Sequence, residues 1–133
     1  MILVDSSVWI AFFNGTDSWQ ADHLAAILHN EQVLIGDLIP SEVLQGFRHK
    51  KDFETGLRLM LLNHVVPLGG QPAAIEAALK YRQLRVLGVI TRNTVDSLIA
   101  SACIRNEWQL LHQDREFEPY CEHLGLKAIG RYD

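Results

Sequence analysis

Four carboxylates in this sequence, Asp5, Glu42, Asp96 and Asp114, stand where metal-assisted hydrolysis of a phosphodiester would need them. Asp5 and Asp114 follow short apolar runs that are typical of buried strands, whereas Glu42 and Asp96 fall in the first turns of predicted helices. In a parallel α/β sheet, the carboxyl ends of the strands and the starts of the following helices share one edge. We therefore expect the four side chains to converge there.

Neighbouring carboxylates repel one another, so some of them would take up a proton unless a cation compensates their charge. Hard oxygen ligands suit Mg²⁺, with Mn²⁺ as a substitute, better than zinc, and neither the six histidines nor the two cysteines show zinc-type spacing. A bound cation can orient a water for attack on phosphorus, and a second one can stabilise the leaving oxygen. The acids are thus predicted to be chiefly metal ligands, while one of them, or a water that it holds, takes the proton of the attacking water.

Each acid also has a purely structural interpretation. Asp5 is a candidate helix cap, and Glu42 in a first helical turn complements the helix dipole. Asp96 and Asp114 have the same alternatives, as caps or surface residues. An aspartate that only interacted with the helix dipole would more often point to solvent. Asp96 instead lies at the start of a helix face made of small and apolar residues. The shared edge favours the joint interpretation over four separate ones.

The sequence gives weaker evidence that other polar residues belong to the site. Ser7 is either a helix-cap serine or a hydroxyl donor to Asp5 or to a metal-bound water. Glu116 and Glu118 lie close enough in sequence to assist, but they fit a solvated helix face better. His112 is interpreted as a residue at a strand end rather than as a base.

Length and composition predict one domain, residues 1–133, because 133 residues with 48% apolar and 21% charged side chains support a single core. The sequence shows no membrane span and no signal-peptide pattern, so we expect a cytoplasmic protein. Cys103 and Cys121 are predicted to be free thiols.

The net charge of −4 argues against a protein that merely coats nucleic acid, although cations bound by clustered acids would still permit a nuclease. The basic residues that could contact phosphates, and that could equally be solvated charges at helix ends, are Arg48, Lys50, Lys51, Arg82, Arg85 and Arg92.

The predicted elements alternate between strand and helix, which is typical of a three-layer α/β domain with a mostly parallel central sheet flanked by helices. Ser6 or Ser7 is expected to cap the first helix and Thr94 the helix that carries Asp96. The strands are expected at 2–4, 32–35, 64–68, 109–112 and 127–129, and the helices at 8–13, 17–30, 38–51, 53–62, 73–85, 94–103 and 115–121. On the helix at 73–85, Ile75, Ala78 and Leu79 are expected to face inward.

Four stretches that together span nearly the whole chain resemble the PIN-domain family, and more closely the VapC toxins of type II toxin–antitoxin pairs. They are residues 2–10 (ILVDSSVWI), 42–48 (EVLQGFR), 96–100 (DSLIA) and 110–117 (LLHQDREF). The first and last stretches are fairly specific in combination. The family's acids fall on Asp5, Glu42, Asp96 and Asp114. The chain departs from the family pattern at His112, where threonine is common, which bears on how Asp114 is oriented.

The resemblance implies a PIN-like fold and a Mg²⁺-dependent endoribonuclease that acts as a toxin. It also implies a cognate VapB-like antitoxin, an RNA substrate, and a homodimer that pairs with antitoxin into a hetero-oligomer.

Three alternatives belong to other classes of protein. A non-catalytic PIN-like module that binds RNA or protein would be signalled by the loss of one or more acids, and all four are present. A phosphoaspartyl enzyme that uses Asp5 is disfavoured, because a dehalogenase-type phosphatase needs a second aspartate where this chain has Ser7. A receiver domain would need a late lysine that is not evident.

Overall fold

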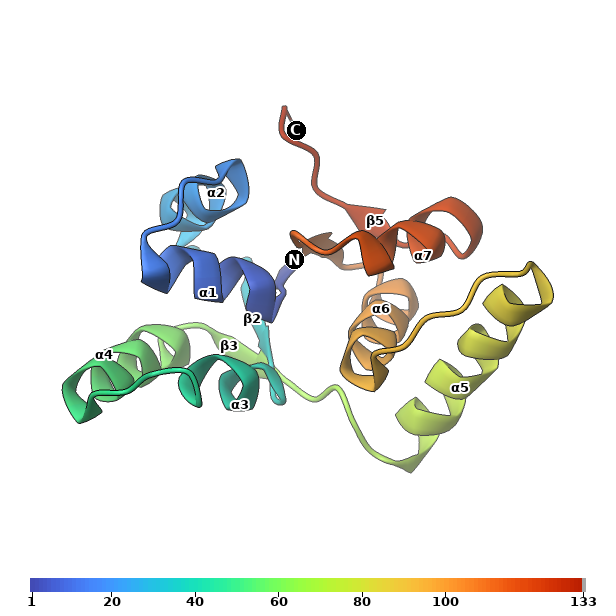
Figure 1. Ribbon diagram of the computed structural model, residues 1–133, viewed down its shortest axis with the longest axis horizontal. Helices are drawn as coiled ribbons and strands as arrows, with labels where there is room; N and C mark the ends of the chain where they lie inside the picture. Colours follow the sequence, from blue (N-terminus) through green and yellow to red (C-terminus); the bar gives the residue numbers. More distant parts are fainter. Residues whose placement is uncertain (133) are drawn as a thin grey trace.

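A central sheet of five parallel strands organises the chain in a computed structural model that describes residues 1–132 (Figure 1). Each strand is short, and the strand order is β3-β2-β1-β4-β5. In the register, Leu3 of β1 pairs with Leu34 of β2 on one side and with Leu110 of β4 on the other. The strands are β1 (Ile2–Val4), β2 (Val33–Gly36), β3 (His64–Val66), β4 (Gln109–Leu111) and β5 (Lys127–Ala128).

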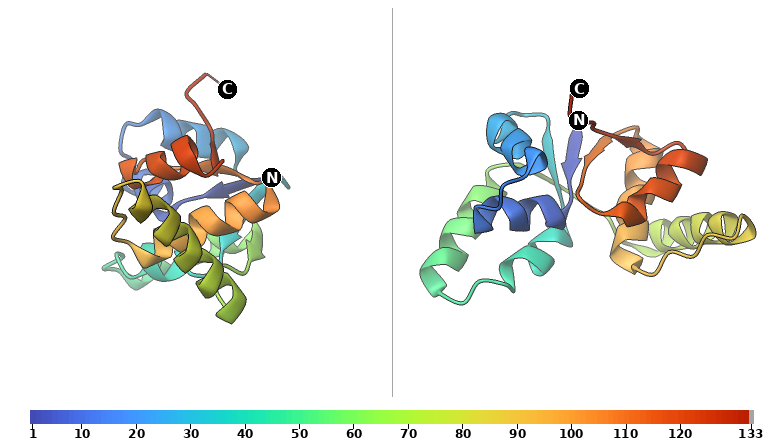
Figure 2. Two further views of the ribbon diagram at one scale, coloured as in Figure 1. Left: turned by 90° about the vertical axis from the view of Figure 1, so that its right-hand side faces the viewer. Right: turned by 45° about the horizontal axis from the view of Figure 1, so that its top comes forward.

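Helices cover both faces of the sheet, which gives the three layers that the sequence predicts (Figures 1 and 2). One face carries α1 (Ser6–Asn14), α2 (Trp19–Ile27), α3 (Ile39–Leu44) and α4 (Lys50–Leu61). The other carries α5 (Gln71–Val86), α6 (Thr94–Asn106), the 3₁₀ turn η1 (Arg115–Phe117) and α7 (Glu118–His123). The three-layer α/β fold class is confirmed. Asp133, the last residue of the predicted domain 1–133, lies outside the described residues.

The sheet contains a topological switch point between β1 and β4. From β1 the chain adds β2 and then β3 on one side, and it then returns to place β4 and β5 on the other side. The loops after β1 and β4 therefore diverge toward opposite faces. In open α/β sheets this divergence creates the crevice in which ligands bind.

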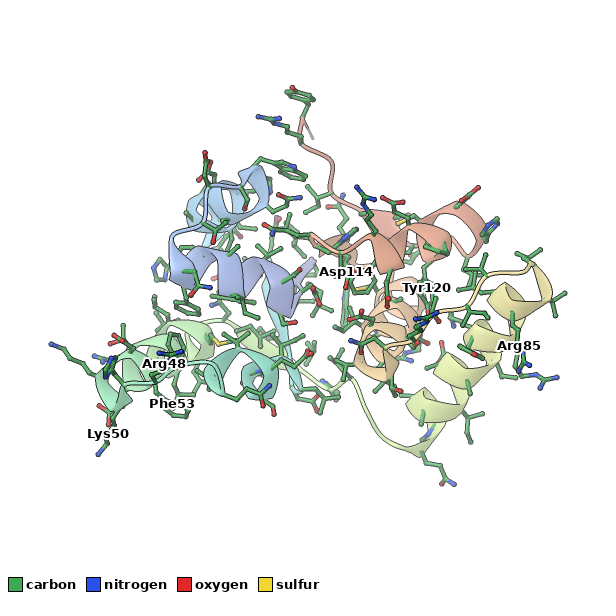
Figure 3. The ribbon with its side chains drawn as sticks, in the orientation of Figure 1. Arg48, Lys50, Phe53, Arg85, Asp114 and Tyr120 are labelled. Carbon is green, nitrogen blue, oxygen red and sulfur yellow. The ribbon has the colours of Figure 1, made fainter. Side chains whose placement is uncertain are left out.

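The core forms because the central strands are apolar on both sides. Leu3, Val4 and Leu111 are wholly buried, and Trp9 of α1 is buried beneath them. On the opposite face Tyr120 of α7 is buried, and its hydroxyl lies 2.9 Å from Ser97 Oγ of α6 (Figure 3). Small residues on α6 allow this helix to approach the sheet closely.

One predicted helix face is wrong. We expected Ile75, Ala78 and Leu79 to point inward, but all three are exposed. Instead, α5 buries Ala77 and Leu84, which lie seven residues and therefore two turns apart on the side that meets α6. The apolar stripe that the sequence displays thus faces away from the core of this chain.

Helix caps and boundaries differ from expectation in several places. Asp5, not Ser6 or Ser7, caps α1, and Asn93, not Thr94, caps α6, because these side chains reach the free N–H groups of the first turns. The helix from 38 ends at Leu44, so Arg48 lies in the following loop. The helix expected at 115–121 is divided between η1 and α7. Among the described residues, no helix has the length and apolarity to span a membrane.

Candidate active site

Asp5 lies at the topological switch point, directly after β1. Its N–H donates to Leu111 O at 2.9 Å, which fixes the backbone against the end of β4. One carboxylate oxygen, Oδ2, caps α1 by accepting from Ser7 N at 3.1 Å and from Ser7 Oγ at 2.5 Å. The other oxygen, Oδ1, is buried and has no hydrogen-bond partner. Asp5 is therefore a helix cap, as the structural alternative held, and it also keeps one free oxygen.

Asp96 reaches the same region from the opposite face of the sheet. It is the third residue of α6, where its N–H donates to Asn93 Oδ1 at 3.1 Å. Only 6% of the residue is exposed, and Oδ2 is buried without a partner. The predicted inward face below it, Ile99, Ala100 and Cys103, is buried.

Glu42 and Asp114 lie on either side of Asp5 and Asp96. Glu42 is half-buried on α3, the nearby Ser6 hydroxyl favours its charged form, and its Oε1 is buried without a partner. Asp114 caps η1 by accepting from Glu116 N at 2.9 Å. Figure 3 shows Asp114 between the two halves of the molecule.

Asp96 lies within electrostatic reach of the other three acids. Burial, the charges of Asp5 and Asp114, a hydrogen bond with Asp114 and the charge of Glu42 together raise the pKa of Asp96 to about 8. Burial raises the pKa of Asp5, although the bonds from Ser7 oppose this shift. Burial and the neighbouring charge of Asp5 raise the pKa of Glu42. Desolvation dominates each shift, and mutual repulsion adds to it at Asp96 and Glu42.

The chemistry of these donors fits a hard divalent cation. Three acids, Asp5, Glu42 and Asp96, each keep one buried oxygen without a partner, and such atoms are costly unless a ligand or an ion satisfies them. A cation would also relieve the repulsion that raises their pKa values. As the side chains stand, however, no group of three or more His, Cys, Asp or Glu residues within 1–132 is arranged to hold a metal ion.

Supporting residues around the acids were only partly foreseen. The hydroxyl bond from Ser7 to Asp5 is confirmed, whereas the contacts of Ser6, Asn93 and Gln113 were missed. Gln113 accepts from Ser18 Oγ at 2.6 Å and donates through its N–H to Ser7 Oγ at 3.2 Å. Asn93 was detectable in principle, because asparagine before a helix is a strong cap.

Three of the candidate phosphate-binding residues, Arg48, Lys50 and Arg85, lie away from Asp114. Figure 3 places Arg48 and Lys50 around the outer end of α4 and Arg85 toward the outer end of α5, on opposite sides of Asp114. Lys50 forms an exposed ion pair with Glu54 at 3.7 Å. Any phosphate contacts made by these residues would therefore lie on the flanks of the site.

Together, the fold and the site define a three-layer α/β domain with carboxylates gathered at the switch point of a parallel sheet. The sequence profile of the PIN domain matches residues 2–122, and the chain belongs to the PIN-domain family. It is 32% identical over 135 residues to Ribonuclease VapC11 of Mycobacterium tuberculosis, an alignment that covers 98% of each protein.

Two solved structures show the same fold. VapBC2 from Rickettsia felis, bound to a DNA fragment from its promoter, aligns with a TM-score of 0.73 at 18% identity, over 97% of this chain and 98% of that chain. A toxin–antitoxin complex from Klebsiella pneumoniae aligns with a TM-score of 0.73 at 13% identity, over 100% of this chain and 99% of that one.

Proposed function

We propose that this protein is a metal-dependent endoribonuclease and the toxin of a type II toxin–antitoxin pair. Membership of the PIN-domain family and the likeness to a VapC ribonuclease support the class of enzyme. The observation that carries the proposal is the set of three buried, unpartnered carboxylate oxygens on Asp5, Glu42 and Asp96. We assign these acids and Asp114 as metal ligands and catalytic residues.

The proposed cofactor is Mg²⁺, with Mn²⁺ as a substitute, and when bound it would neutralise the carboxylates, orient a water and polarise the phosphodiester. Asp5 contributes a preorganised ligand, because Ser7 holds one of its oxygens and leaves the other free. Asp96 holds a proton near neutral pH in the metal-free protein, since its pKa is about 8. A hydrogen bond to Asp114 stabilises this protonated form.

The proposed substrate is single-stranded or looped RNA. An extended strand can bring a phosphate to the carboxyl edge of the sheet while its neighbouring phosphates extend toward the flanks. Exposed cations on one flank, Arg48, Lys50 and Lys51, would attract those neighbouring phosphates. The four carboxylates would thus bind the cation, and a separate basic surface would bind the RNA strand.

The proposed partners are a cognate VapB-like antitoxin and a second copy of this chain. Similar folds occur in a VapBC complex and in another toxin–antitoxin complex, which supports the first. The bare apolar side of α5 supports the second, because Ile75, Leu79 and Val86 are 55%, 57% and 87% exposed. Contiguous exposed apolar side chains commonly mark protein interfaces.

The test is cleavage of a labelled, single-stranded RNA by the purified protein with Mg²⁺ or with EDTA. Asp5→Asn and Asp96→Asn should each lower the rate by orders of magnitude while the circular dichroism spectrum is unchanged. Asp52→Asn is the matched control, because Asp52 is an exposed aspartate on α4 and is not one of the four acids. Full cleavage in EDTA, or by either site variant, would refute the proposal, and binding without cleavage would favour the non-catalytic module.

A further inference from the structure

The segment that joins β4 to η1 carries Asp114, and side-chain acceptors receive two of its backbone N–H groups and a third from η1. Gln113 N donates to Ser7 Oγ at 3.2 Å, and Asp114 N donates to His112 Nδ1 at 3.2 Å. Glu116 N donates in turn to Asp114 Oδ1 at 2.9 Å. The path of this loop is therefore set by side chains and not by the sheet ladder, which ends at Leu111.

The bond between His112 and Asp114 has the geometry of an Asx turn. In an Asx turn, the side-chain oxygen of Asp or Asn accepts from the N–H two residues later, as Asp5 does here from Ser7 at 3.1 Å. The Nδ1 atom of histidine is separated from its Cα by the same number of bonds as Oδ1 of asparagine. An imidazole whose Nδ1 carries no hydrogen can therefore close the same ring.

Packing fixes the orientation of this imidazole. The ring centroid of His112 lies 4.9 Å from that of Phe117, with 55° between the ring planes, and Phe117 is wholly buried. Since Nδ1 accepts from Asp114 N, the neutral ring must carry its hydrogen on Nε2. The ring of His112 thus has a single orientation and a single neutral tautomer, in which Nδ1 is the hydrogen-bond acceptor.

We propose that His112 is a positioning residue, whose Nδ1 holds the Asp114 amide in an Asx-type turn and so directs the Asp114 carboxylate toward Asp96. The consequence for the cation and for RNA rests on the proposed function, whereas the turn itself does not. Asp114 already commits Oδ1 to Glu116 N, so the direction of its other oxygen follows from the backbone that His112 fixes. The interaction that depends on this direction is the one between the carboxyl groups of Asp114 and Asp96, which lie within electrostatic reach of each other.

Three substitutions distinguish the contribution of the hydrogen-bond acceptor at residue 112 from that of the aromatic ring. His112→Asn keeps an acceptor at the same number of bonds, His112→Thr offers a hydroxyl that closes this kind of turn more weakly, and His112→Leu removes the acceptor but keeps an apolar side chain. His64→Leu is the matched control, because His64 is an exposed strand histidine whose side chain makes no hydrogen bond within residues 1–132.

The first readout uses the metal-free protein and needs no activity. We expect the Asp114 amide to exchange slowly with deuterium in the parent and in His112→Asn, and about tenfold faster or more in His112→Leu. A long-range ¹H–¹⁵N spectrum of the parent should show the Nε2–H tautomer of His112. A tautomer with the hydrogen on Nδ1, or equal exchange in all variants, would overturn the proposal. If His112→Leu fails to fold, the tautomer of His112 in the parent and amide exchange in His112→Asn and His112→Thr still test the proposal.

The second readout is titration with Mn²⁺ alone, followed by electron paramagnetic resonance. Removing an outer support of a metal ligand typically weakens metal affinity about 10–100-fold, and we expect that loss in His112→Leu, with near-parental affinity in His112→Asn. In cleavage assays the loss should appear in kcat at subsaturating Mg²⁺ and leave the KM for RNA unchanged. Equal weakening in the Asn and Leu variants would assign the effect to ring packing and refute an acceptor role. If the parent cleaves no RNA, the proposed function fails, while amide exchange still tests the turn.

Discussion

Replacing Asp96 by asparagine should stabilise the metal-free protein while it abolishes cleavage. The side chain is almost fully buried, and its pKa rises from an ordinary value of 3.8 to about 8 on folding. An acid whose pKa is higher in the folded state destabilises the fold at pH values above its unfolded pKa. The penalty is complete above pH 8 and fades as the pH falls toward 4.

The size of the effect follows from the shift. At about 1.4 kcal/mol per pKa unit, keeping Asp96 neutral at pH 7 costs about 4 kcal/mol relative to the unfolded chain. Burying the uncharged amide of asparagine has its own cost of about 2 kcal/mol. The expected net gain is therefore about 2 kcal/mol, which for a chain of this size raises Tm by roughly 6–10 °C.

Thermal melts of the parent and of Asp96→Asn, in EDTA and across a pH series, measure this directly. The variant should melt higher near pH 7, and its advantage should shrink steadily as the pH falls toward 4. Saturating Mg²⁺ should stabilise the parent, by about 2.7 kcal/mol at one hundred times its dissociation constant, and stabilise the variant less.

Asp52→Asn provides the contrast, because Asp52 is also the third residue of its helix but is exposed. Its loss should lower stability by about 0.3–1 kcal/mol, since a carboxylate near a helix start is favourable. If Asp96→Asn melts below the parent in EDTA, Asp96 is a structural acid held by hydrogen bonds, and the reasoning fails.

Three further predictions concern the surface. Neutralising Arg48, Lys50 and Lys51 together should weaken RNA binding and reduce the slope of log K against log salt by up to about 2, measured by fluorescence anisotropy; an unchanged slope would make them ordinary solvated charges. The antitoxin should cover the acidic edge with an extended or helical C-terminal segment whose arginine takes the place of the cation, so the co-purified complex should not cleave RNA; undiminished cleavage by the complex would contradict this mode. Leu79→Asp on α5 should shift the sedimentation coefficient from dimer to monomer, and an unchanged coefficient would remove α5 from the dimer interface.

The sequence was sufficient for the sheet and for the placement of the four acids along the chain. Buried parallel strands are apolar on both sides, so the runs around Leu3 and Leu110 could be recognised without a partner strand. The convergence of acids followed from a rule about sheet edges and needed no side-chain geometry. Their roles as ligands and catalytic residues remain predictions.

The errors arose where tertiary contacts select between equivalent local patterns. On α5 the sequence offers two apolar sides, and only packing against α6 determines that Ala77 is buried and Ile75 is exposed. At the start of α1, aspartate and serine are all good caps, and the position of β1 decides in favour of Asp5. The bond from Asp114 N to His112 could not be foreseen, because histidine is not among the residues that commonly close such turns.

The most direct test of the four-carboxylate site is a crystal of the parent protein soaked in Mn²⁺, with diffraction data collected at the manganese absorption edge. An anomalous peak within coordination distance of Asp5 Oδ1 and Asp96 Oδ2 is expected, with the carboxylates of Glu42 and Asp114 turned toward it, and crystals of Asp96→Asn should lose this peak. No anomalous peak at the carboxyl ends of β1 and β4, or a peak bound elsewhere on the chain, would contradict a metal-dependent active site at these residues.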